Sequence, residues 1–190
     1  MKKQSNTWNT EYPYFVGALI LSVIFLYGKM KAKKQIVTFE GQNYQKKLFE
    51  FLTKEEGVRN RVYKDQAGFD TIGIGHKIQK GEERLLSVTL TPKEIEDLFF
   101  LDIIKFEAAI ANSVKVPLND NQKVALVSLA FNIGTSAFQR SSLLRLLNQG
   151  KYREASLEFP KWKFITIKGQ KVVSKGLEAR RFREQLLFNS

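Results

Sequence analysis

The amino-acid sequence predicts an α+β fold over residues 42–190, in which a small β-hairpin lobe accompanies a mainly helical lobe, preceded by one N-terminal transmembrane helix. Three observations lead to this prediction. Apolar residues recur at helical spacing along most of residues 42–190, two short runs between residues 61 and 74 are rich in β-branched and aromatic residues, and residues 12–28 carry no charge. About 150 residues of such pattern suffice for one domain with a sizeable core.

The N-terminal segment divides into a tail, an anchor and a tether. Residues 12–28 are seventeen uncharged residues, which as a helix would cover ~25 Å of a ~30 Å hydrocarbon core. We therefore expect residues 1–11 to form an N-terminal tail, residues 12–28 a transmembrane anchor and residues 29–41 a basic tether. The aromatic residues expected at the membrane interface are Trp8, Tyr12, Tyr14 and Tyr27.

Two other interpretations of residues 12–28 are weaker. A cleavable signal peptide needs a small-x-small site, and the apolar run meets the basic cluster at residues 29–34 without one. A buried core helix would ordinarily have a polar side, and nothing polar interrupts the circumference here. Lysines lie on both sides of the run, and the four that follow it would keep the C-terminal domain on the cytoplasmic side of a membrane.

The domain is expected to begin with a helix that leads into a hairpin. Residues 42–56 carry apolar residues at helical spacing, and Gly57 ends that pattern, so Glu56 is expected at the helix end. Residues 61–63 and 71–74 have the composition of two short strands, and residues 65–70 supply the turn between them. Asp65 then lies at the entrance of the turn.

The remainder reads as helices joined by short connections. Thr91, Pro92 and Glu94 form an N-terminal capping pattern for a helix that runs to about residue 112. Asn119 or Asp120 caps a second helix, which Gly134 ends. A short helix is expected from Ser141 or Ser142, followed by helices over residues 152–159 and 175–187, with a hairpin tip at residues 168–170.

Glu56 and Asp65 are placed so that both can face one cleft. Two carboxylates on opposite sides of a sugar can act as the acid that protonates the leaving group and the base that activates water, which is the chemistry of glycoside cleavage. The alternative is that both acids pair with neighbouring arginines and lysines on a solvated surface, which is the usual situation of charged residues.

The segment from Glu56 to His76 contains the pattern Glu-Gly-x-Arg-x-x-x-Tyr-x-Asp-x-x-Gly-x-x-Thr-Ile-Gly-x-Gly-His in full. This pattern resembles the active-site segment of the phage-type lysozymes, glycoside hydrolase family 24. The resemblance covers residues 42–188, because further matches follow Glu56 to His76 in the order expected for this family. These matches are Ala130 to Thr135 with Ala137 and Phe138, Ser142 to Leu144, Leu147 with Asn148, and Gly176 to Arg181 with Glu184.

The resemblance implies a role for each of three residues in a lysozyme-like fold. Glu56 matches the general acid, Asp65 the second carboxylate and Thr71 the hydroxyl that helps to hold the water. The family hydrolyses the β-1,4 bond between N-acetylmuramic acid and N-acetylglucosamine in peptidoglycan. Two alternatives remain open, which are a lytic transglycosylase acting on the same bond and a non-catalytic glycan-binding protein of a virion membrane. Asn132 and Gln139 are candidate substrate-binding residues, because they lie close to Phe131 in the sequence. A helix-surface or capping role fits them equally well.

Residue composition and net charge limit which ligands and binding partners are expected. His76 is the only histidine and there is no cysteine, so no metal site, no cofactor and no Ser-His-Asp triad is expected, and His76 is expected to make a structural hydrogen bond or ion pair. The net charge of +12 favours polyanionic cell wall, and no specific nucleic-acid motif accompanies it. The oligomeric state is not indicated by the sequence.

The resemblance and the anchor together suggest two locations for the enzyme. A membrane-anchored endolysin would be exported and then leave the bilayer, as endolysins with signal-arrest-release anchors do. A virion-associated lysozyme in a membrane-containing phage would be held away from the host wall until entry. In both cases the expected substrate is bacterial peptidoglycan, and the expected attachment is to the host inner membrane or the virion membrane.

Overall fold

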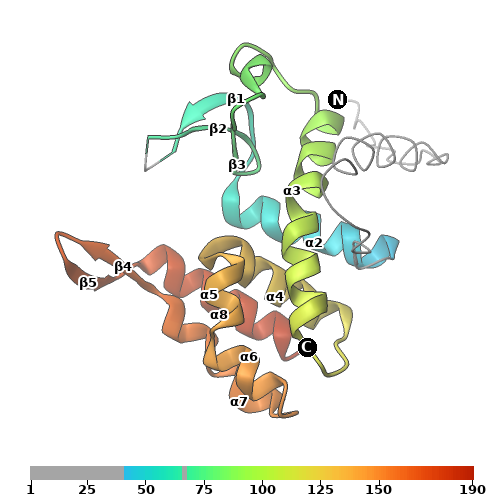
Figure 1. Cartoon of the computed structure of the whole chain (residues 1–190), viewed down its shortest axis with the longest axis vertical. Helices are drawn as coiled ribbons and strands as arrows, with labels where there is room; N and C mark the ends of the chain where they lie inside the picture. Colours follow the sequence, from blue (N-terminus) through green and yellow to red (C-terminus); the bar gives the residue numbers. More distant parts are fainter. Residues whose placement is uncertain (1–40, 66–67) are drawn as a thin grey trace, which may run out of the picture. The chain divides into compact units, whose positions relative to one another are not determined.

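The computed structural model of the chain describes residues 41–65 and 68–190, and these begin with helix α2 (Gln42–Glu56) (Figure 1). Helix α2 buries Tyr44, Leu48 and Leu52, which lie four residues apart on one face. The predicted tail and anchor lie outside the described residues, as does almost all of the predicted tether. Within the described ranges, no helix combines the length and the apolar character that a membrane span requires.

A three-stranded antiparallel sheet follows α2 directly. Its strands are β1 (Arg59–Lys64), β2 (Asp70–Gly73) and β3 (His76–Lys77), in the order β1-β2-β3. The two predicted strands are confirmed, with β1 beginning two residues earlier than expected. Strand β3 was not predicted, because a two-residue strand offers too little pattern to read. A short 3₁₀ turn, η1 (Glu83–Leu86), completes this lobe, and the amide of Leu90 donates to the carbonyl of Asn60 in β1 at 2.8 Å.

Helix α3 (Pro92–Ser113) runs from the sheet lobe into the helical lobe (Figure 1). Its N-terminus is the predicted capping box, in which Thr91 accepts from the amide of Glu94 while Glu94 accepts from the amide of Thr91. Its length of 22 residues corresponds to about 33 Å, so one rigid element connects both lobes. The buried face of α3 carries Ile95, Phe99, Ile103, Phe106, Glu107, Ala109 and Ile110.

Helix α4 (Asp120–Ile133) lies at the centre of the helical lobe. Every residue from Val124 to Ala130 is buried, because α4 is covered by α2, α3, α5 and α8. Asn119 caps it, as one of the two predicted alternatives, and Gly134 ends it at φ 87°. The elements around it are α5 (Thr135–Gln139), α6 (Ser142–Leu147), α7 (Tyr152–Ser156), η2 (Phe159–Trp162) and α8 (Lys175–Phe188).

The fold class is confirmed for the described residues as helices with small antiparallel sheets. The second sheet is the hairpin of β4 (Phe164–Ile167) and β5 (Gln170–Val173), with its tip at the predicted position. One local expectation was wrong, and one short helix was not predicted. The helix predicted over residues 152–159 ends at Ser156, and a separate 3₁₀ turn, η2, begins at Phe159 with Pro160 in its first turn. The five-residue helix α5 was not predicted.

Candidate active site

Glu56 is the last residue of α2, as predicted. Gly57 follows with φ 73° and its amide donates to the carbonyl of Thr53 at 3.0 Å, which closes the helix. The side chain of Glu56 is 22% exposed, so it is accessible without being fully solvated. A methyl group on Gly75 would lie 3.8 Å from Oε2 of Glu56 and 3.7 Å from the ring of Phe131. Both distances are ordinary van der Waals contacts, so Gly75 is favoured at this position by its φ of 73° rather than by lack of room.

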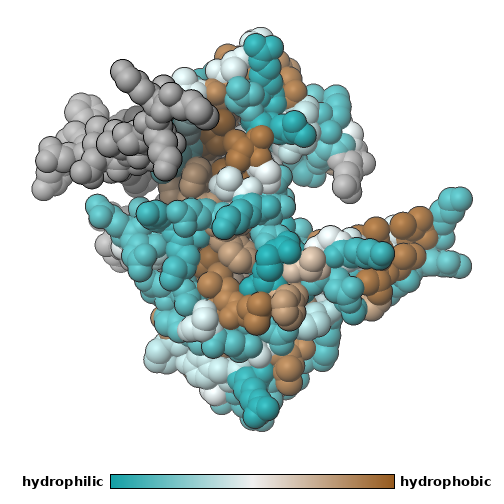
Figure 2. Space-filling view, turned by 180° about the vertical axis from the view of Figure 1, so that it is seen from behind, coloured by the Kyte–Doolittle hydropathy of each residue, from teal (hydrophilic) through white to brown (hydrophobic). Residues whose placement is uncertain are grey.

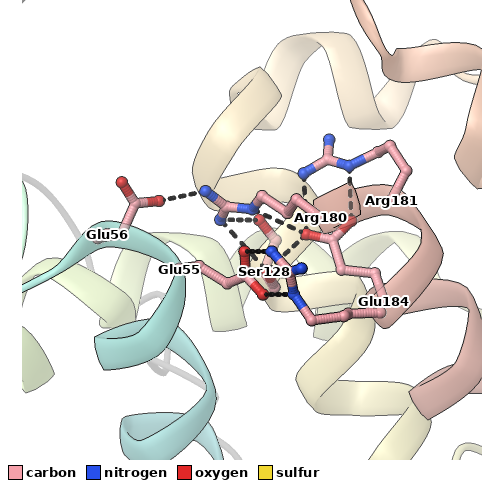
Figure 3. Close-up of polar contacts among 7 residues, drawn as sticks. Glu55, Glu56, Ser128, Arg180, Arg181 and Glu184 are labelled. Carbon is pink, nitrogen blue, oxygen red and sulfur yellow. Dashed lines mark hydrogen bonds and ion pairs between the residues drawn. The ribbon is translucent and has the colours of Figure 1, made fainter. Parts of the chain in front are cut away.

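Arg180 of helix α8 holds the other oxygen of Glu56. Its Nη1 donates to Oε1 of Glu56 at 2.5 Å (Figure 3). Its Nη2 donates to the carbonyl and to Oγ of Ser128, both at 3.2 Å, and its Nε donates to Glu184 at 3.1 Å. Because four contacts fix one planar guanidinium, the position of the Glu56 carboxylate is set by α4 and α8 as well as by its own helix.

Behind Arg180 lies a buried group of charges. Glu184 and Arg181 are both fully buried, and Nε of Arg181 lies 2.9 Å from Oε2 of Glu184. Oγ of Ser128 donates to Oε1 of Glu184 at 2.6 Å. Two arginines thus face one buried glutamate, and Glu56 supplies the second negative charge of the cluster. The neighbouring Glu55 borders this cluster with 3% of its side chain exposed, and it accepts from Nε and Nη2 of Arg183 at 2.6 Å and 2.8 Å (Figure 3).

Asp65 lies at the entrance of the β1–β2 turn, as predicted. Its Oδ1 accepts from the amide of Phe69 at 2.9 Å, and its Oδ2 pairs with Nζ of Lys77 at 3.0 Å. Its backbone also brackets the turn, because its amide donates to the carbonyl of Phe69 at 2.9 Å. The side chain of Asp65 is 20% exposed. Its carboxylate is therefore oriented by one contact within the turn and one contact to β3, while part of it still reaches solvent.

Thr71 lies in β2 and meets the same peptide group as Asp65. Its hydroxyl donates to the carbonyl of Phe69 at 3.1 Å, and the residue is buried with 2% exposure. Asp65 and Thr71, to which the resemblance assigns the positioning of water, thus both contact Phe69. The burial of Thr71 was not foreseen, and it follows from the pairing of β2 between β1 and β3.

Tyr63 connects the two carboxylates electrostatically. Burial raises the pKa of the Tyr63 phenol, and the negative charges of Glu56 and Asp65 raise it further. Glu56 at the end of α2 and Asp65 at the β1–β2 turn thus both act on one tyrosine of β1. That the two carboxylates face one cleft stays a prediction.

Asn132 and Gln139 are not brought into one pocket. Gln139 lines a hollow of about 460 Å³ between α3 and the α4–α5 junction, together with Asn112 and Thr135, and its amide nitrogen donates to Oγ of Ser113 at 3.4 Å. Asn132 is exposed near the end of α4 and does not line this hollow.

His76 has a structural role, as predicted. Its Nδ1 lies 2.8 Å from Oδ2 of Asp102 in α3, and its Nε2 lies 3.0 Å from Oε2 of Glu82. Burial lowers its pKa, but the hydrogen bonds and charges of these two carboxylates outweigh that effect, so the pKa is raised above its ordinary value. The buried ring therefore joins the sheet lobe to the long helix.

Sequence reasoning missed the role of Arg180. The segment from Gly176 to Arg181 was noted only as a match, and nothing in its local pattern indicates a partner 124 residues away. A usable signal was present, because two adjacent arginines with a glutamate three and four residues later place an excess of positive charge on a helix that packs into the core. That excess requires another carboxylate nearby.

Most of the chain is similar to known proteins. The profile of the phage lysozyme family matches residues 53–184. The endolysin of Acyrthosiphon pisum secondary endosymbiont phage 1 is 37% identical over 139 residues, which are 73% of this chain and 92% of that protein. The SAR-endolysin of Escherichia phage Mu is 35% identical over 164 residues, which are 85% of this chain and 91% of that protein. The crystal structure of a P22 lysozyme mutant superposes with a TM-score of 0.67 at 37% identity, covering 81% of this chain and all of that one.

Proposed function

Because the chain belongs to the phage lysozyme family, we propose that Glu56 and Asp65 are the acid and the base with which it cleaves peptidoglycan. The enzyme is a lysozyme, or muramidase, that serves a phage as a peptidoglycan hydrolase for host lysis. The observation that carries the residue assignment is the way both carboxylates are held: Arg180 fixes Glu56 at the end of α2, and the amide of Phe69 and the ammonium of Lys77 fix Asp65 at the β1–β2 turn.

The contacts of Glu56 assign different tasks to its two oxygens. Arg180 binds Oε1 and leaves Oε2 available. Oε2 is therefore the oxygen proposed to carry the proton to the glycosidic oxygen of the substrate. Glu56 must be protonated before this transfer, and the ion pair with Arg180 stabilises the carboxylate that remains after it.

Asp65 acts as the base in this proposal. Its contacts with Phe69 and Lys77 favour an ionised and oriented carboxylate. It takes a proton from a water molecule whose oxygen bonds to the anomeric carbon from the face opposite the leaving group, so the product has inverted configuration. Thr71 donates its proton to the carbonyl of Phe69, and its oxygen can still accept a hydrogen bond from that water.

The alternative reaction is that of a lytic transglycosylase, which forms an anhydro sugar without water. The side chains of Asp65 and Thr71 both bind the backbone of Phe69, and this placement supports hydrolysis, because a carboxylate and a hydroxyl are the groups proposed to position water. Mass spectrometry of muropeptides released from purified peptidoglycan distinguishes the outcomes. Reducing ends support hydrolysis, anhydro ends that are one water lighter support the transglycosylase, and an absence of cleavage supports a glycan-binding protein.

Membrane attachment through residues 12–28 is a second part of the proposal. It rests on the uncharged apolar run in the sequence, and the name SAR-endolysin carried by the relatives from Escherichia phage Mu and Pseudomonas phage phiKMV supports it. We infer that the anchor holds the enzyme at the host inner membrane until release brings it to the wall. Attachment to a virion membrane is the alternative. Access of an added protease to residues 29–41 from the outer or the cytoplasmic side distinguishes these cases.

A further inference from the structure

The hairpin of β4 and β5 exposes apolar side chains on both of its faces. Phe164, Ile165, Ile167, Val172 and Val173 are each between 41% and 49% exposed. Ile165 pairs with Val172 and Phe164 pairs with Val173, so each pair lies on one face and the two pairs lie on opposite faces. Figure 2 shows the hairpin as an arm that stands out from the body, with hydrophobic side chains along it and hydrophilic ones at its tip.

Nothing in the described part of the chain covers this arm. Strands β4 and β5 pair only with each other, and all eight of their residues are exposed. An isolated two-stranded hairpin is at best marginally stable in water, and a contiguous exposed apolar surface ordinarily marks an interaction site. The arm therefore requires an apolar partner.

The positive charge of the segment that contains the arm indicates that its partner is negatively charged. Residues 159–177 contain five lysines and no acidic residue. Lys161 and Lys163 pair with Glu158 and Glu178 at the base of the arm, both at 2.6 Å. Across the described ranges, no carboxylate forms an ion pair with Lys168, Lys171 or Lys175. Lys168 stands in the turn itself, with φ 49°, and Lys171 lies on β5.

We propose that the β4–β5 hairpin is a membrane-contact arm, which places its apolar side chains in the interface of an anionic phospholipid bilayer while Lys168 and Lys171 bind headgroup phosphates. A four-residue strand extends about 13 Å, which suits the ~5 to 10 Å depth at which interfacial segments are buried. Wall glycan offers carboxylates and hydroxyls to the lysines but no hydrocarbon to the apolar residues. An anionic lipid surface supplies hydrocarbon for the apolar side chains and phosphates for the lysines, and therefore fits both parts of the arm.

The contact is independent of the proposed anchor, so its test must report on the arm alone. The chain has no cysteine, and therefore Ile167→Cys provides one site for a polarity-sensitive fluorophore in the full chain. Ser136→Cys, on the exposed surface of α5, is the matched control. The two labelled proteins are mixed with phosphatidylglycerol-containing vesicles, with or without a spin-label quencher in the acyl chains, and with vesicles of phosphatidylcholine alone.

If the arm contacts lipid, the fluorescence emission of the label at position 167 should shift to the blue and be quenched in anionic vesicles. The label at position 136 should show little of either effect. The response at position 167 should be weaker in phosphatidylcholine vesicles. Adding Lys168→Gln and Lys171→Gln to the Ile167→Cys chain should shift the equilibrium away from lipid contact by about fivefold per lysine. Circular dichroism checks that the fold is retained.

Three results would overturn the proposal. One is an unquenched label at 167 in anionic vesicles, and another is equal quenching at 167 and 136. The third is burial of the label at position 167 in the absence of vesicles. Burial that increases with protein concentration would indicate contact with a second copy of the chain, and burial on purified peptidoglycan would indicate contact with the wall. Since the label reports lipid contact directly, a failure of the proposed roles of Glu56 and Asp65 would leave this test unaffected.

Discussion

Nη1 of Arg180 donates a hydrogen bond to Oε1 of Glu56 at 2.5 Å, although the two residues are 124 positions apart in the sequence. This contact ties the first helix of the domain to the last one. It also gives the candidate acid a fixed orientation, because the same guanidinium is held by Ser128 and Glu184. If Glu56 is the acid as proposed, stability and catalysis are coupled at this contact.

Arg180→Gln should destabilise the enzyme and impair it together. The substitution removes one of the two cations that face the buried Glu184, and breaking a buried ion pair costs about 3 to 5 kcal/mol. Denaturant unfolding measures this loss. Lys93→Gln is the control, because it breaks an exposed pair with Asp97, and such pairs contribute about 0 to 1 kcal/mol. Equal unfolding free energies for the two variants would contradict the account of the buried cluster.

Asp65→Asn and Asp70→Asn should differ sharply in turnover. Asp65 is the proposed base, and a neutral amide cannot take the proton from water, so turnover on purified peptidoglycan should fall by at least about 100-fold. Asp70 pairs with Lys64 on the surface, with 37% of its side chain exposed, and its replacement should be mild. The reverse ranking in turnover, with both variants folded, would remove Asp65 from the mechanism.

His76 should make stability depend on pH. Its pKa is raised above the ordinary 6.5 by Asp102 and Glu82 acting against burial. A raised pKa in the folded state means that the stabilisation is fully present below 6.5 and is lost as the pH rises through the folded-state pKa. Unfolding free energies measured from below 6.5 into the alkaline range should therefore decline, and His76→Gln should lose this decline. A decline of equal size in His76→Gln would assign it to other groups.

Local chemistry made the element ends predictable, whereas long-range contacts were not. The capping pattern of Thr91, Pro92 and Glu94 and the stop at Gly57 determine helix ends through adjacent residues, and both were read correctly. Strand β3 exists because its two residues meet β2, so it leaves no local signal. The adjacent arginines of α8 indicate that a carboxylate is needed, but the packing of α8 on α4 decides which one it is. The family pattern located Glu56, Asp65 and Thr71, but it did not reveal that Thr71 is buried against Phe69.

The anchor should be sensitive to one charge. Leu21→Arg places a cation near the centre of residues 12–28, at a cost of ~2.5 to 3.5 kcal/mol for insertion. Membranes washed with carbonate should retain the full-length wild type, whereas the variant should move to the soluble fraction and still cleave purified peptidoglycan. Leu21→Ala is the matched control. A soluble wild type, or a mature form that begins after Lys34, would favour a cleaved signal peptide instead.

The turnover of Glu56→Gln on purified peptidoglycan tests the central claim most directly, with Glu55→Gln as the neighbouring control. Both substitutions keep the shape and remove an ionisable group, but Glu55 is bound to Arg183 outside the site. The account predicts that Glu56→Gln loses at least about 100-fold in turnover, while Glu55→Gln stays close to wild type and both remain folded by circular dichroism. Cleavage by Glu56→Gln within threefold of wild type would contradict the assignment of Glu56 as the general acid.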